Sequence, residues 1–137
     1  MTRIEQIGDC RLILGDAVEL VPALGPIDSI VTDPPYGMLF RSNHRRIRHE
    51  AIANDGDAAE KPVSLMERVV RWTDGTVVDP YCGSGSTGVA CVRLGRPFIG
   101  IEIDEAHFAT ACRRIEAATK EPRLPLPEPK AKQEALL

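Results

Sequence analysis

One ten-residue segment constrains the fold more than any other part of the chain. Residues 76–78 are β-branched and run directly into Asp79-Pro-Tyr-Cys-Gly-Ser-Gly-Ser-Thr-Gly88, and helical spacing begins at residue 87. A strand that turns tightly into a helix favours glycine, because glycine adopts backbone conformations that other residues rarely reach. The amide groups exposed at the start of such a helix favour polar ligands. The segment therefore predicts an α/β domain with a ligand site at this turn.

Short apolar runs alternate with helical segments along the rest of the chain, which is typical of a mostly parallel sheet. The pattern predicts strands at residues 11–14, 27–32, 76–78 and 97–103, and helices at residues 17–24, 63–72, 87–94 and 105–119. We expect Trp72 to lie in the core at the end of its helix. Residues 37–60 are predicted to form a charged loop within a domain over residues 1–119, and the Pro-rich residues 120–137 an extended tail.

Composition narrows the class of protein. The 137 residues suffice for one domain, and a net charge of −3 argues against a globally basic nucleic-acid coat. No apolar run reaches the length of a membrane span, and the first residues contain no apolar leader segment. The four cysteines form no CxxC pair, so we expect reduced thiols, no metal site and a cytoplasmic location. Cys82 and Cys91 are interpreted as small packing residues.

The glycine spacing admits a dinucleotide site. Gly83, Gly85 and Gly88 fit G-x-G-x-x-G, and Glu102 at the end of the next predicted strand offers a carboxylate to ribose hydroxyls. Against this, Asp79 lies between the strand and the glycines, where its charge would face a pyrophosphate. No lysine follows the glycines, which excludes a P-loop. A nicotinamide-dependent oxidoreductase therefore stays as an alternative function.

A second motif follows the predicted strand at residues 27–32. In Asp33-Pro34-Pro35-Tyr36 the two prolines restrict the backbone just beyond the strand. The Asp33 carboxylate and the Pro34 carbonyl can accept hydrogen bonds from both hydrogens of an exocyclic amine, which draws the nitrogen toward sp³ geometry. Tyr36 can stack on a base that has left its duplex, as base-modifying enzymes require. The motif favours chemistry on the amino group of a nucleobase.

With both motifs in view, the chain resembles the amino-group DNA methyltransferases, which methylate adenine N6 or cytosine N4. Residues 33–36, 79–88 and 98–102 carry the resemblance, and residues 12–16 and 61–66 agree with it. The order of the motifs, with 33–36 before 79–88, resembles the beta class of the family, and aspartate at position 33 points to adenine. The resemblance implies a Rossmann-like fold that binds S-adenosylmethionine. The sheet would be reduced, because only about two dozen residues separate the Asp33 motif from residue 61.

The resemblance also implies roles for individual residues. Asp33, Pro34, Pro35 and Tyr36 would form the catalytic motif. The expected cofactor-binding residues are Asp16 (adenine amine), Asp79 (ammonium), Glu102 (ribose hydroxyls), Gly83 and Gly85 (methionine part) and Tyr81. Asp16 has an alternative role as the N-cap of the helix over residues 17–24. Because the middle segment is short, a non-catalytic remnant that binds S-adenosylmethionine or DNA is a further alternative.

Three features predict partners. The basic stretch with Arg41, Arg45, Arg46 and Arg48 is expected to contact DNA phosphates, with a solvated loop as the alternative. The strand over residues 27–32 would leave an exposed apolar edge, which suits a homo-oligomer or a partner chain. Residues 133–137 resemble short peptides that dock on the bacterial replication clamp, although a featureless tail is the alternative. We expect a bacterial or phage protein associated with the nucleoid.

Overall fold

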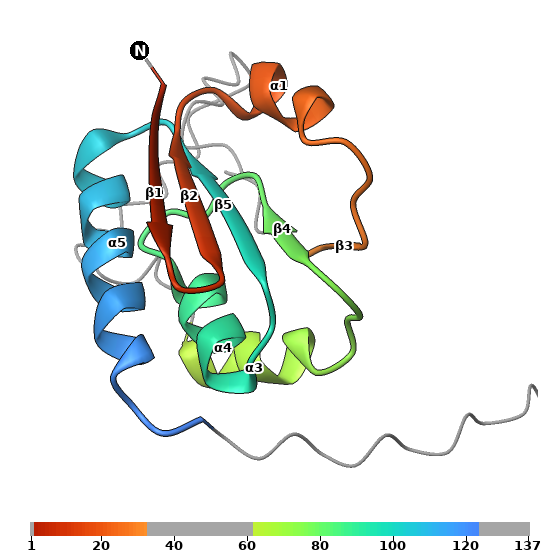
Figure 1. Ribbon diagram of the computed structural model, residues 1–137, viewed down its shortest axis with the longest axis vertical. Helices are drawn as coiled ribbons and strands as arrows, with labels where there is room; N and C mark the ends of the chain where they lie inside the picture. The colour runs from red at the N-terminus through yellow and green to blue at the C-terminus, as the bar shows by residue number, and fades with distance from the viewer. Residues whose placement is uncertain (1, 33–61, 124–137) are drawn as a thin grey trace, which may run out of the picture.

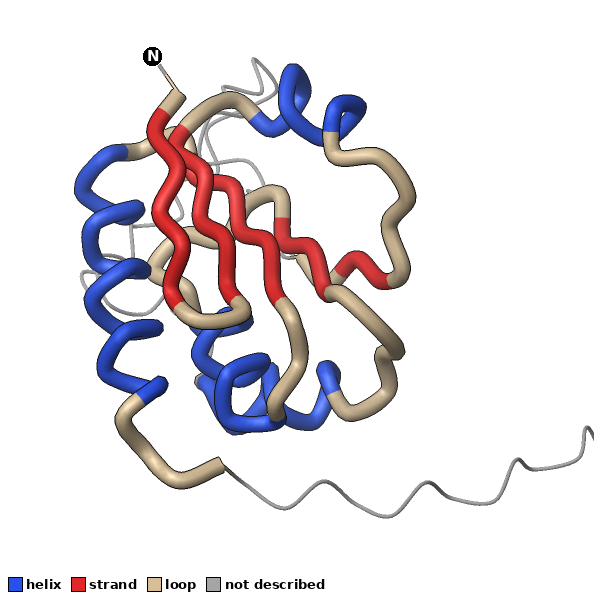
Figure 2. The backbone as a smooth tube through the Cα atoms, in the orientation of Figure 1, coloured by secondary structure: helices blue, strands red, loops and turns tan. Residues whose placement is uncertain are grey.

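Five strands form one mixed sheet in the part of the chain that the structure describes, residues 2–32 and 62–123 of a computed structural model (Figure 1, Figure 2). The strands are β1 (Arg3–Ile7), β2 (Cys10–Leu14), β3 (Ser29–Ile30), β4 (Val77–Asp79) and β5 (Phe98–Glu102), in the spatial order β1-β2-β5-β4-β3. The helices are α1 (Ala17–Leu20), α3 (Val63–Val70), α4 (Ser86–Leu94) and α5 (Glu105–Thr119), with a 3-10 turn η1 (Val21–Ala23) after α1.

Four of the strands run parallel with β5 near the centre. β5 pairs with β2 on one side, where Leu14 lies opposite Glu102, and with β4 on the other, where Asp79 lies opposite Gly100. β4 in turn pairs with β3 in parallel, which confirms that the strand predicted over residues 27–32 lies beside the strand that leads to the glycines. The order of the strands and the helical crossover from β4 to β5 confirm the predicted Rossmann-like α/β fold.

The core has a layer on each face of the sheet. On one face, α3, α4 and α5 pack against the sheet in a cluster that includes the fully buried Phe98 and Phe108. On the other face, α1 and η1 cover a smaller cluster around Ile13 and Ile101. Figure 1 shows α5 alongside β1 and β2, and α1 at the upper end of the sheet. Each buried phenylalanine contributes about 1.5–3 kcal/mol through its removal from water.

The sequence analysis missed β1. This strand pairs antiparallel with β2 through a two-residue turn in which Ile7 lies opposite Cys10 and Gly8 has a φ of +56°. The apolar residues Ile4 and Ile7 are three positions apart, so the strand lacks the strict alternation that sequence reading relies on. The Gly8-Asp9 turn was the available signal, because such dipeptides connect hairpins.

Other elements differ from prediction in length or burial. The helix predicted over residues 17–24 is α-helical only to Leu20 and then tightens into η1, where Pro22 lacks the amide hydrogen that a longer helix needs. Trp72 was expected in the core, and this was wrong, because 84% of its surface is exposed. β3 is the edge strand of the sheet over the described residues, and Ile30 is 55% exposed there, as the predicted apolar edge requires.

Candidate functional site

The carboxyl ends of the parallel strands bring the predicted acids to one edge of the sheet. The turn after β2 is tied to the end of β5 by a hydrogen bond from the Gly15 amide to the Glu102 carbonyl, 2.9 Å long. The turn after β4 is tied to β5 in the same way, because the Cys82 amide donates to the Ile101 carbonyl at 2.9 Å. Open α/β sheets bind ligands in the crevice at this edge, so the acids lie where the fold places a site.

The two glycines of the turn after β4 have different surroundings. Both lie in the left-handed region, Gly83 at a φ of +52° and Gly85 at +86°. A Cβ on Gly83 would have no heavy atom within 4 Å, whereas a Cβ on Gly85 would lie 2.9 Å from the Cβ of Ala111 in α5. Gly85 therefore lets the turn pack against α5, and Gly83 leaves an open face on which a ligand could lie against the backbone.

Glu102 connects this turn to the start of α5. Its Oε2 accepts a hydrogen bond from the Gly83 amide at 2.7 Å, and its Oε1 accepts one from the Asp104 amide at 2.9 Å. A carboxylate has about four acceptor positions, so these bonds leave room for ligand hydroxyls. Glu102 thus holds the glycine turn in place and still has capacity to bind.

Asp79, at the end of β4, is almost fully buried, with 4% of its surface exposed. Burial raises the pKa of its carboxyl above the ordinary value of 3.8, because the charged form loses its hydration. Hydrogen bonds from the Tyr81 amide and from the side chains of Thr87 and Thr32 favour the charged form and partly offset this. Asp79 therefore holds the turn through its bonds to Tyr81 and Thr87. Its contact with Thr32 links the end of the β3 segment to the glycine turn.

Asp16 caps α1 and also lines a cavity. Its Oδ1 accepts a hydrogen bond from the Val18 amide at 2.8 Å, which confirms the capping role considered from the sequence. The carboxylate is exposed and borders a cavity of about 60 Å³ at the carboxyl edge of the sheet. The cavity is lined by Gly15, Asp16, Ala17, Pro80, Tyr81, Ile101, Glu102 and Ile103. Three predicted cofactor-binding residues, Asp16, Tyr81 and Glu102, thus meet at one cavity.

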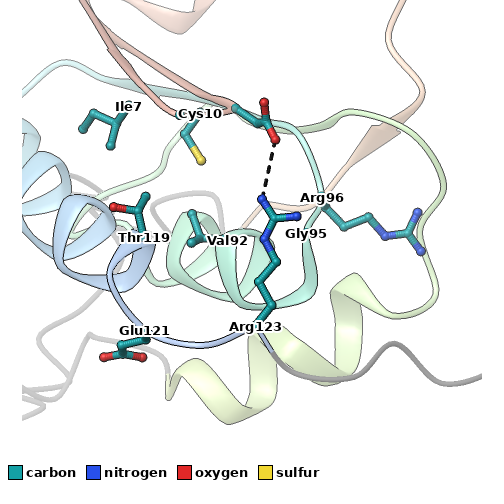
Figure 3. Close-up of a pocket in the computed structure, with 10 residues that line it drawn as sticks. Ile7, Cys10, Val92, Gly95, Arg96, Thr119, Glu121 and Arg123 are labelled. Carbon is teal, nitrogen blue, oxygen red and sulfur yellow. Dashed lines mark ion pairs between the residues drawn. The ribbon is translucent and has the colours of Figure 1, made fainter.

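A larger cavity, of about 300 Å³, lies at the opposite end of the strands (Figure 3). It is lined by the β1–β2 turn and by the carboxyl ends of α4 and α5, and none of the predicted site residues borders it. Figure 3 shows Arg123 extended toward the β1–β2 turn, where it pairs with Asp9 at 3.9 Å. Both side chains of this pair are largely exposed, so it adds little to stability.

The structure describes only part of the predicted site. The residues predicted to bind a cofactor lie at or beside the carboxyl edge: Asp16, Asp79, Tyr81, Gly83, Gly85 and Glu102. Several predicted residues lie outside the described ranges: Asp33, Pro34, Pro35, Tyr36, Arg41, Arg45, Arg46, Arg48 and the segment 133–137. Sequence reasoning missed Thr32, Thr87 and Arg114, which contact the site from neighbouring elements. The hydroxyls were an available signal, because Thr32 directly precedes the Asp33 motif and Thr87 lies within the glycine motif.

The remaining candidates take structural roles. Cys82 and Cys91 are buried as predicted, and burial raises the pKa of each thiol, which keeps them protonated.

Among residues 2–32 and 62–123, no group of three His, Cys, Asp or Glu side chains could hold a metal ion. None of the helices in these ranges is long and apolar enough to cross a membrane.

Curated relatives match a part of the chain. Type II methyltransferase M2.DpnII of Streptococcus pneumoniae is 43% identical over 61 residues, which are 42% of this chain and 23% of the relative. DNA adenine methyltransferase YhdJ of Escherichia coli (strain K12) is 31% identical over 77 residues, which are 54% of this chain and 26% of the relative. The chain therefore spans about a quarter of the length of these relatives.

Solved structures match over a similar share. The M1.HpyAVI–SAM complex is 42% identical with a TM-score of 0.40, and the match covers 42% of this chain and 31% of that one. The putative DNA modification methylase TTHA0409 of Thermus thermophilus, in complex with S-adenosyl-L-methionine, is 34% identical with a TM-score of 0.40, covering 42% of this chain and 26% of that one.

A family model covers more of the chain. The N6/N4 methyltransferase model, described as DNA methylase, matches residues 40–113, which is more than half of the 137 residues. The matched range holds α3, β4, α4, β5 and the glycine turn, together with Glu102. The chain therefore belongs to the amino-group DNA methyltransferase family.

Proposed function

We propose that the chain binds S-adenosylmethionine at the carboxyl edge of its sheet and methylates the exocyclic N6 amine of adenine in DNA. The observation that carries the proposal is the meeting of Asp16, Tyr81 and Glu102 at one cavity beside an open glycine turn. Membership of the DNA methylase family favours S-adenosylmethionine over a nicotinamide dinucleotide. The name of the relative YhdJ supports adenine as the acceptor.

The residues at the edge suit this cofactor. A ribose offers two hydroxyl donors, and the Glu102 carboxylate has acceptor positions beyond the two that Gly83 and Asp104 occupy. Asp16 uses Oδ1 for its cap, so its other oxygen can accept from the adenine amine. A cavity of about 60 Å³ holds only part of the cofactor, and the open face of Gly83 offers a surface for the rest.

The protein's contribution to the reaction is position and electrostatics. S-adenosylmethionine, when bound, supplies a methyl group on a positively charged sulfur. In the proposed mechanism, the Asp33 carboxylate and the Pro34 carbonyl accept hydrogen bonds from the two hydrogens of the base amine, which makes its nitrogen lone pair available to the methyl carbon. Once the methyl group has moved from sulfur to nitrogen, the amine releases one of these hydrogens as a proton to solvent. Pro35 restricts the backbone and Tyr36 stacks on the extruded base. The hydrogen bond between Thr32 and Asp79 supports a location of this motif beside the glycine turn, because Thr32 directly precedes Asp33.

The arginines at positions 41, 45, 46 and 48 are proposed to contact DNA phosphates near the target base. They form the only strongly basic stretch of the sequence, whereas the chain as a whole has a net charge of −3. A local basic segment on an acidic body directs DNA to one face of a protein.

A methyl-transfer assay tests the proposal. The full chain is incubated with unmethylated DNA and S-adenosylmethionine carrying a tritiated methyl group, and the DNA is then digested to nucleosides. We expect the label in N6-methyldeoxyadenosine. Label in N4-methyldeoxycytidine would show that cytosine is the acceptor, and no label in the DNA would refute catalysis by this chain.

The variant Asp33→Ala separates catalysis from binding. We expect it to abolish methyl transfer, because the amine loses its carboxylate acceptor, while calorimetric affinity for S-adenosylmethionine stays close to that of the parent chain. Asp28→Ala is the matched control, because Asp28 also adjoins β3 but accepts a hydrogen bond from the Thr76 amide at the amino end of that strand. Equal turnover in Asp33→Ala and the parent chain would refute the assignment.

A second candidate function is a non-catalytic domain that binds S-adenosylmethionine or DNA. It is favoured by the short middle segment, because only about two dozen residues separate the Asp33 motif from residue 61. This candidate predicts measurable binding of S-adenosylmethionine in calorimetry together with no transfer of label.

A further inference from the structure

Arg114 of α5 reaches across to the glycine turn. Its Nη1 donates to the Ser84 carbonyl and to Ser84 Oγ, each at 2.9 Å, and it lies 3.3 Å from Ser86 Oγ. The arginine is half-buried, so these charge-assisted hydrogen bonds form away from full exposure to water. One guanidinium thus contacts the turn on both sides of Gly85.

The same face of α5 also supports the turn by packing. Ala111 lies one helical turn before Arg114, and it is the residue that a Cβ on Gly85 would meet at 2.9 Å. The turn is closed by a hydrogen bond from the Gly85 amide to the Cys82 carbonyl at 2.8 Å. α5 therefore holds the turn at two positions, because Ala111 packs against Gly85 and Arg114 donates hydrogen bonds to Ser84.

On the opposite side, the turn is held by Glu102. The Gly83 amide donates to Glu102 Oε2 at 2.7 Å, and Gly83 is the residue with the open face. Because Ser84 directly follows Gly83, the position of Arg114 fixes where the Gly83 amide and its open face lie. Loss of the Arg114 contacts would free the turn on one side while Glu102 still holds the other.

We propose that Arg114 is a positioning residue that keeps the glycine turn in the conformation that binds the cofactor. The effect on affinity rests on the proposed function, whereas the effect on the turn itself does not. Arginine suits this position because its planar guanidinium holds Nη1 at a fixed angle to the two serines, whereas lysine carries its charge on a flexible stem. A lysine at this position would restore only part of the contacts.

Two variants of adjacent residues test the proposal. Arg114→Met keeps the apolar stem and removes the donors, and Arg113→Met is the matched control on the same helix. Arg113 is exposed, and its side chain hydrogen-bonds to Thr110 Oγ1 within α5, away from the turn. Amide exchange and calorimetry are carried out for both variants, for Arg114→Lys and for the parent chain.

The first measurement is hydrogen exchange without ligand. Arg114→Met is expected to speed exchange of the Gly83 and Gly85 amides by about tenfold, the scale of one lost charge-assisted hydrogen bond, while the Ile101 amide in β5 keeps its rate. Arg113→Met should leave all three rates unchanged, and Arg114→Lys should fall between. Equal rates in the two methionine variants, or a uniform rise at all three amides, would overturn the proposal.

The second measurement is calorimetry with S-adenosylmethionine. We expect an affinity about tenfold lower for Arg114→Met than for Arg113→Met, with partial recovery in Arg114→Lys. Affinities within about twofold of each other would overturn the positioning role, because one lost charge-assisted hydrogen bond exceeds that difference. If the parent chain fails to bind S-adenosylmethionine, the proposed function fails, and the exchange rates still decide whether Arg114 holds the turn.

Discussion

The difference between Gly83 and Gly85 leads to a quantitative prediction. Alanine at Gly85 must adopt a φ of +86° and place its Cβ 2.9 Å from the Cβ of Ala111. The left-handed backbone costs about 1–2 kcal/mol, and overpacking the contact with α5 costs about 1–3 kcal/mol more. Alanine at Gly83 meets no atom within 4 Å and has only the backbone cost, about 1–2 kcal/mol. Gly85→Ala should therefore lower the free energy of unfolding by about 1–3 kcal/mol more than Gly83→Ala.

Urea unfolding followed by circular dichroism measures both free energies, and an unchanged m-value keeps them comparable. A double-mutant cycle is a more direct test, because Ala111→Gly removes the Cβ that the new side chain in Gly85→Ala would approach most closely. We expect favourable coupling between Gly85→Ala and Ala111→Gly, of about 0.5–3 kcal/mol, and none between Gly83→Ala and Ala111→Gly. Equal losses in the two alanine variants, or no coupling at position 85, would show that the contact with α5 does not govern the choice of glycine.

Three further predictions concern charges. Because burial raises the pKa of Asp79 in the folded chain above 3.8, the carboxyl binds its proton more tightly when folded. The contribution of the Asp79 carboxyl to stability is therefore present below pH 3.8 and is lost as the pH rises through the pKa of the folded chain. In urea titrations, the free energy of unfolding of the parent chain should fall with rising pH relative to that of Asp79→Asn. Arg93 bonds Glu67 at 3.0 Å and Glu121 at 3.3 Å, and Arg93→Met should cost about 1 kcal/mol in thermal unfolding, whereas Asp9→Asn should cost almost nothing. Replacing Arg41, Arg45, Arg46 and Arg48 by glutamine should reduce the salt dependence of DNA binding by about 0.9 in slope for each arginine that contacts a phosphate, and an unchanged slope would leave that segment without a role in binding.

The fold was predictable where local pattern and tertiary position agree. The β4–turn–α4 unit shows its strand, its glycines and its helix within one continuous segment, so the sequence indicates both the fold class and the edge that carries the site. The edge positions of Glu102 and Asp16 were predictable, because Glu102 ends a strand, Asp16 lies just after one, and parallel strands end at a common edge.

Features that depend on distant contacts were not predictable. The need for glycine at position 85 comes from Ala111, 26 residues further along the chain, and local sequence reading assigned that glycine to the ligand. The contact of Arg114 with Ser84 spans 30 positions, and α5 offers several arginine and acidic residues that look alike in sequence. Trp72 follows an amphipathic helix and yet lies exposed, because amphipathic spacing identifies an apolar face without showing what covers it.

Under the proposed function, Asp16 and Glu102 each serve two purposes, and this changes how loss-of-function variants should be interpreted. Asp16 caps α1, and Glu102 accepts hydrogen bonds from the backbone of the turn that it borders. Replacing either residue by alanine removes these structural hydrogen bonds along with any bond to a ligand, so an inactive variant at these positions says little about contact with a ligand. Isosteric amide replacements, paired with a measurement of unfolding, are the substitutions that can tell the two purposes apart.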